Sequence, residues 1–128
     1  MKKVIAASLV FVSFTTLAHM NCLVGNYVNA KGEKIFSLSA QHHSGVLSNL
    51  QTGEHITVSM MKEKQILNVW KRMQWSKESA SDAECAADKA MKHIVCELSN
   101  TDAEPKFNHS PNIYLNSKDE LTLLRRKE

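Results

Sequence analysis

Turn-forming residues recur at short intervals along most of the chain, and this spacing constrains the fold more than any other feature. The segments between the turns are rich in Val, Ile, Leu, Thr and aromatic residues. Short β-prone segments that are separated by tight turns are typical of antiparallel strands that follow one another in a meander. We therefore expect a mainly β fold, a small antiparallel up-and-down barrel or sandwich of about eight strands with one short helix. The expected strands cover residues 23–29, 34–41, 46–51, 54–61, 66–75, 93–99, 112–116 and 120–126.

Apolar and polar residues alternate within several of these segments. Ile56, Val58 and Met60 would lie on one face of a strand, with Thr57 and Ser59 on the other. A closed sheet with one filled interior accounts for this pattern, and closure also removes exposed strand edges.

One segment has a helical period instead. Alanines at positions 83, 86, 87 and 90 follow the spacing i, i+3, i+4, i+7, which is typical of a helix with one buried face. Ser81 and Glu84 have the spacing of a capping box. The pattern predicts a helix from about Asp82 to Lys92, lying across the sheet or over one mouth of the barrel.

The start of the chain has the pattern of a secretion signal. Two lysines follow the first Met, residues 4–18 are uncharged, and Thr16 and Ala18 supply small residues before a plausible cleavage point. We expect residues 1–18 to be a signal peptide and 19–128 to form one exported domain, periplasmic or secreted. A buried N-terminal strand or helix in a cytosolic protein is the alternative.

Cys22 raises a second alternative, a lipid-anchored N-terminus. Lipoprotein signals have small residues directly before the cysteine, whereas this chain has His, Met and Asn there. The poor fit favours a soluble exported protein, and membrane attachment is expected only if Cys22 carries a lipid.

Three cysteines in an exported chain predict one disulfide and one unpaired thiol. A Cys85–Cys96 bridge would close a short loop and stabilise the fold by about 3 kcal/mol in the chain-entropy model. It would connect the expected helix to the strand that follows. Spacing alone does not fix the connectivity, so a Cys22–Cys96 bridge stays open.

The first and last expected strands show a family resemblance. Gly25-Asn26-Tyr27 resembles the Gly-x-Trp start of lipocalin-like (calycin) barrels, with Tyr in place of Trp. The ending over residues 121–126 resembles their last strand, whose Arg packs over the first-strand aromatic. The resemblance implies an up-and-down barrel topology, and it implies a small apolar ligand in the barrel.

Patterns of catalytic and metal-binding residues are weak. The sequence has no Gly-x-Ser-x-Gly motif, no glycine cluster of the phosphate-binding kind and no paired acids on an apolar strand. The meander brings His42, His43 and His109 to one end of the sheet, but their irregular spacing favours exposed loop histidines over a metal site. We expect no enzymatic activity, no metal and no cofactor.

Trp70 and Trp75 are the candidates for contact with a partner. Their odd separation places them on opposite faces of a strand over residues 66–75, so one of them would point outward beside Arg72. Trp and Arg dominate the energetics of many protein interfaces. The three residues are therefore candidates for a contact patch, and the alternative is that the outward tryptophan packs under the expected helix.

Charge and composition narrow the kind of partner. The formal charge of +3 falls to +1 without the two leading lysines, which gives no electrostatic case for nucleic acid. We expect a binding protein that recognises a protein partner, in an inhibitor or immunity-type role. A carrier of a small apolar ligand and a structural envelope lipoprotein are the alternatives. Protein binding predicts a filled barrel and an outward Trp, whereas a carrier predicts an apolar cavity of several hundred Å³.

Overall fold

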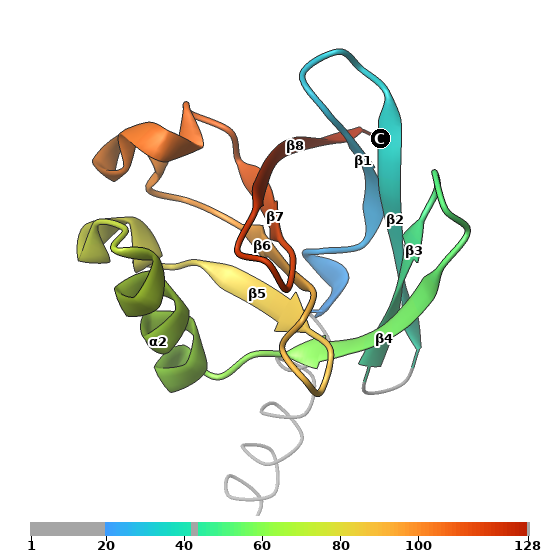
Figure 1. Ribbon diagram of the computed structural model, residues 1–128, viewed down its shortest axis with the longest axis horizontal. Coiled ribbons are helices and arrows are strands. Elements are labelled where there is room, and N and C mark those ends of the chain that lie inside the picture. The colour runs from blue at the N-terminus through green and yellow to red at the C-terminus, as the bar shows by residue number, and fades with distance from the viewer. Residues whose placement is uncertain (1–19, 42–43, 128) are drawn as a thin grey trace, which may run out of the picture.

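The computed structural model describes residues 20–41 and 44–127, and they form a closed antiparallel barrel (Figure 1). Eight strands are hydrogen-bonded in sequence order, and the last pairs with the first. The predicted mainly β barrel is thereby confirmed. The strands are β1 (Gly25–Val28), β2 (Lys34–Gln41), β3 (Ser44–Asn49), β4 (His55–Met60), β5 (Glu84–Ala87), β6 (Ile94–Glu97), β7 (Asn112–Leu115) and β8 (Leu121–Lys127).

Asparagine side chains organise three of the hairpin turns. Asn29 Oδ1 accepts the backbone N–H groups of the residues two and four positions later, and Asn116 does the same in the β7–β8 turn. Asn49 Oδ1 accepts two N–H groups in the β3–β4 turn. Backbone N–H groups that donate to a nearby Asn side chain are not available for pairing with another strand. Each Asn therefore marks the end of one strand and the start of a turn.

The segment predicted as the longest strand is helical, so that prediction is wrong. Helix α2 (Glu63–Met73) begins where the Gln65 side chain accepts the Lys62 backbone N–H, and it ends at Gln74 in the left-handed region (φ 58°). Its buried residues are Ile66, Val69 and Trp70. Their i, i+3, i+4 spacing places them on one helix face, which lies against the barrel wall beside β5, β6 and β7 (Figure 1).

The helix predicted from Asp82 to Lys92 is also wrong. Residues 84–87 form strand β5, and a turn over 88–93 leads to β6. Asp82 and Met91 adopt positive φ values of 59°, which interrupt any helix at these positions. Ala86 and Ala87 are buried on opposite faces of β5, one in each apolar core, whereas Ala90 is exposed in the turn, so the alanine spacing does not mark one buried helical face.

Two apolar cores lie on opposite sides of the same barrel wall. The inner core fills the barrel and includes Tyr27, Phe36, Leu47 and Val58. The outer core lies between the wall and a helical layer, which consists of α2 and the 3-10 helices η1 (Lys77–Ala80), η2 (Thr101–Ala103) and η3 (Pro105–Phe107). Strands β5 to β7 contribute side chains to both cores.

The predicted disulfide is present, although its position in the fold differs from the prediction. Cys85 on β5 and Cys96 on β6 are directly paired strand residues, 4.1 Å apart between Cα atoms, and their sulfurs are bonded. The bridge joins two neighbouring strands under the helical layer instead of joining a helix to a strand. Cys22 is exposed and unpaired, so the alternative Cys22–Cys96 bridge is wrong.

Two other predictions concern residues outside the described part of the chain. The expected signal peptide, residues 1–18, lies there, as do His42 and His43. Among the described residues, none of the helices has the length and apolar character that crossing a bilayer requires.

Candidate functional site

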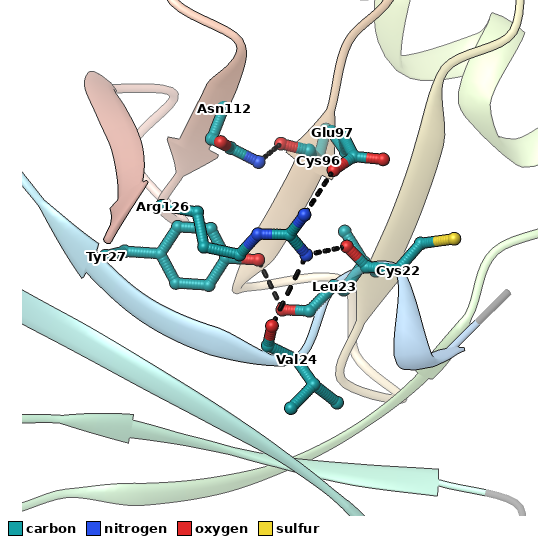
Figure 2. Close-up of polar contacts among 8 residues, drawn as sticks. All are labelled: Cys22, Leu23, Val24, Tyr27, Cys96, Glu97, Asn112 and Arg126. Atoms are coloured by element: carbon teal, nitrogen blue, oxygen red, sulfur yellow. Dashed lines mark hydrogen bonds and ion pairs between the residues drawn. The ribbon is translucent and has the colours of Figure 1, made fainter. Parts of the chain in front are cut away.

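Arg126 organises a polar cluster at the barrel end where β1 begins (Figure 2). Its side chain lies over Gly25, where an added Cβ would come within 2.7 Å of the arginine Cδ. The guanidinium donates to the backbone carbonyls of Cys22 and Val24 and forms an ion pair with Glu97 at 3.4 Å. One side chain of the last strand thus fixes the segment that leads into the first strand.

Tyr27 belongs to the same cluster and is fully buried. Its hydroxyl donates to the Leu23 carbonyl. Burial raises the pKa of Tyr27 to about 12, an effect that the nearby Arg126 charge partly offsets and Glu97 reinforces. The polar groups shown in Figure 2 are engaged with one another, which is typical of a structural closure rather than of a site that receives a ligand.

The two tryptophans predicted to lie on opposite faces lie together in the outer core. Trp70 and Trp75 expose only 2% and 6% of their surfaces, and their ring centroids are 4.9 Å apart in an edge-to-face arrangement. Phe107 completes the cluster, and Trp70 Nε1 donates to Ser79 Oγ at 2.8 Å. The prediction of an outward tryptophan is wrong, because the helix and the turn after it direct both rings toward the barrel wall.

Arg72 is separated from the tryptophans by its own contact. Its guanidinium forms a 3.0 Å ion pair with Asp119 in the β7–β8 turn, and both side chains are about half exposed. The predicted trio of Trp70, Arg72 and Trp75 therefore does not form a single patch.

A surface depression of about 440 Å³ nevertheless lies beside both tryptophans. We call it the tryptophan cleft, and it is lined by Leu67, Asn68, Trp70, Lys71, Gln74, Trp75 and Lys77. Leu67, Lys71 and Gln74 are spaced i, i+4 and i+7, so a helical period places them on one face. Leu67 and Lys71 were not predicted at this surface because a strand period was assigned to residues 66–75, and Lys77 lies beyond that segment.

The segment that supplies the residues of this cleft carries an excess of positive charge. Residues 62–78 contain five Lys or Arg and two Glu, a formal charge of +3. The remainder of residues 20–127 contains nine basic and ten acidic residues, a formal charge of −1. The segment over residues 62–78 is thus the basic part of an otherwise balanced domain, which favours negatively charged partners at this surface.

The described histidines lie in separate environments. His55 contacts Ser48, His93 contacts the Tyr114 hydroxyl, and His109 pairs with Asp102. Within residues 20–41 and 44–127, no group of three or more His, Cys, Asp or Glu side chains is arranged to hold a metal ion. The site considered from His42, His43 and His109 includes residues outside this part of the chain.

The barrel interior is occupied by side chains of the inner core. Tyr27, Leu47, Val58 and Val95 have no measurable exposure, and the rings of Phe36 and Tyr114 are in contact at 4.4 Å between centroids. The tryptophan cleft is outside the barrel, against the helical layer.

Comparisons with protein-family models, with curated proteins and with solved structures find no match to this chain.

Proposed function

We propose that this protein is an exported binding protein, periplasmic or secreted, that recognises a protein partner through its helical layer. The observation that carries the proposal is the coincidence of the tryptophan cleft with the basic segment over residues 62–78. A rigid barrel that presents an aromatic and basic depression suits recognition in an inhibitor or immunity-type role. The lipocalin-like resemblance enters the proposal only through the topology of the barrel.

The packed interior supports protein binding over the carriage of an apolar ligand. A carrier barrel needs an internal cavity of several hundred Å³. Here the inner-core residues of β1, β3, β4 and β6 are fully buried against one another. A ligand of that kind would have to displace the aromatic pair Phe36 and Tyr114.

The position of Met20 supports a soluble mature chain over a lipoprotein. Met20 is 4% exposed, belongs to the inner core, and lies close to Gly45 of β3. Lipid attachment requires cleavage directly before Cys22, which would remove Met20 from the folded domain. The disulfide supports an oxidising compartment.

Affinity capture from the native envelope or culture fluid tests the proposal. We expect a single stoichiometric protein partner to be recovered with the wild-type protein. Recovery of only a lipid or pigment would support the carrier function instead. The intact mass of the exported chain provides an independent test, because we expect an unmodified Cys22, whereas a diacylglyceryl mass on Cys22 would contradict the soluble form.

A further inference from the structure

The tryptophan cleft combines an apolar surface with two cations that form no ion pair within the described part of the chain. The edges of the buried rings of Trp70 and Trp75 and the half-buried Leu67 provide the apolar surface. The exposed Lys71 and Lys77 lie at the same depression, and neither ammonium group forms an ion pair with a described residue. Arg72, their neighbour on α2, is instead neutralised by Asp119.

We propose that the cleft binds an acidic segment of a protein partner, one apolar side chain of which inserts against Leu67 and the two tryptophans while flanking carboxylates pair with Lys71 and Lys77. This inference rests on the proposed function and specifies its site and the chemistry of the partner. A volume of about 440 Å³ is suited to one anchoring side chain with its flanking backbone rather than to a whole helix.

The charges on either side of Leu67 differ, and this difference sets the orientation of the bound segment. A second depression, of about 670 Å³, shares Leu67 and Lys77 with the cleft but is also lined by Glu63, Asp82 and Glu84. Carboxylates of a partner would be repelled there and attracted on the tryptophan side. We therefore expect the acidic part of the segment to lie toward Lys71.

The same observations favour a protein segment over an anionic membrane surface. Binding to lipid headgroups needs a broad polybasic face or a long amphipathic helix with an exposed apolar side. The apolar side of α2 is covered by the barrel wall, since Ile66, Val69 and Trp70 are all buried. On the tryptophan side of the helix a local depression remains accessible, which suits a single inserted side chain.

The tryptophans provide the readout for a direct test, because they are the only two in the chain and both line the cleft. The probe is the acetylated and amidated peptide Glu-Glu-Phe-Glu-Glu, titrated into the full-length protein while tryptophan emission is recorded. We expect a saturable change with a Kd on the order of 0.1–1 mM, given one apolar anchor and two exposed ion pairs. Replacing Phe with Ala in the peptide should abolish it, and a peptide with Lys in place of Glu should not bind.

Charge-reversal variants localise the contact. Lys71→Glu with Lys77→Glu should raise the Kd at least tenfold. The matched control, Lys89→Glu with Lys92→Glu, makes the same change of charge on exposed residues of the β5–β6 turn and should alter the Kd less than twofold. Leu67→Gln should weaken binding several-fold by adding polarity to the apolar wall. Circular dichroism and thermal unfolding verify that each variant is folded.

Several outcomes would overturn the inference. One is the absence of a saturable change in tryptophan emission up to about 5 mM peptide. Another is an equal loss of peptide affinity in the Lys89→Glu, Lys92→Glu control. The third is binding to phosphatidylglycerol vesicles that depends on Lys71 and Lys77 and is as tight as, or tighter than, binding to the peptide. Capture of a native partner separates this inference from the proposed function. If the wild-type protein and the Lys71→Glu, Lys77→Glu variant capture one partner equally well, the cleft assignment fails and the proposed function stands.

Discussion

The inner and outer cores are built on opposite faces of one barrel wall, yet they are assembled differently. The inner core collects side chains from all eight strands and from Met20 and Leu23, so it is closed on every side by hydrogen-bonded backbone. The outer core depends on α2 and the loop segment containing Phe107, whose buried side chains pack against the wall without being strands of the barrel. The difference indicates that the helical layer can loosen while the barrel stays closed.

Removal of Trp70 should have the largest effect and should break the outer core first. Its ring contacts Trp75 and Phe107, and its indole N–H bonds the buried Ser79. We expect Trp70→Ala to lower the free energy of unfolding by about 3–5 kcal/mol, measured by urea denaturation. Trp70→Phe, which keeps a ring but loses the hydrogen bond, should cost less. A loss below about 1 kcal/mol for Trp70→Ala would show that the outer core contributes little to stability.

Removal of the disulfide should weaken the outer core more than the inner core. The pair Cys85→Ala and Cys96→Ala should cost about 3 kcal/mol, since the bridge restricts the unfolded chain over a short loop. Because the bridge faces the outer core, hydrogen exchange should accelerate more in α2 amides than in β2 and β3 amides. Equal acceleration in all of these elements would mean that both cores unfold as one unit.

High pH should destabilise the inner core through Tyr27. Its pKa is about 12 in the folded protein and 10 when unperturbed, so the folded state holds a proton that the unfolded state releases. The part of the free energy of unfolding that depends on this proton is therefore fully present below pH 10. It is lost as the pH rises toward 12, at about 1.4 kcal/mol per pH unit. Tyr27→Phe should reduce that slope, as measured by urea denaturation at pH 9 to 12. Some slope should remain, because burial also raises the pKa of Tyr114. An unchanged slope would contradict the assignment to Tyr27.

The smallest effect is expected at Arg72. Its ion pair with Asp119 connects the helical layer to the β7–β8 turn, but both side chains are about half exposed. Arg72→Ala should therefore cost less than about 1 kcal/mol and lose even that cost in 0.5 M salt. A larger, salt-independent loss in thermal unfolding would mean that this contact holds the layer in place.

The sequence predicted strands well wherever only one strand face is covered. Residues 34–41 and 55–60 alternate between apolar and polar, and both are strands within a residue or two of the expected bounds. Prediction failed at β5 because Cys85, Ala86 and Ala87 are all buried and small, so neither alternation nor β-branched or aromatic residues mark the strand. Strand β7 is equally buried but contains Ile113 and Tyr114, and it was predicted. It failed at α2 because Leu67, Val69, Met73 and Trp75 also fit a strand period, while Ile66, Val69, Trp70 and Met73 fit the helical one.

The candidate site was predictable only in part. The sequence singled out Trp70 and Trp75, and both line the cleft. A strand period places Arg72 beside the outward tryptophan, whereas the helical period places Lys71 at the cleft. Arg72 was therefore predicted in place of Lys71. The Cys85–Cys96 bridge was predictable because the chain was expected to be exported, and two nearby cysteines of an exported chain tend to pair.

The link between Arg126 and the Cys22 carbonyl spans 104 positions of sequence, and it bears on how the molecule reaches its final form. The barrel becomes a ring only when the last strand finds the first, which is the least local pairing in the chain and so a slow step. Before that moment β1 and β8 both present open backbone, which another copy of the same chain could extend. A high concentration of chains that have not yet closed the barrel is then the condition under which this molecule is exposed to aggregation.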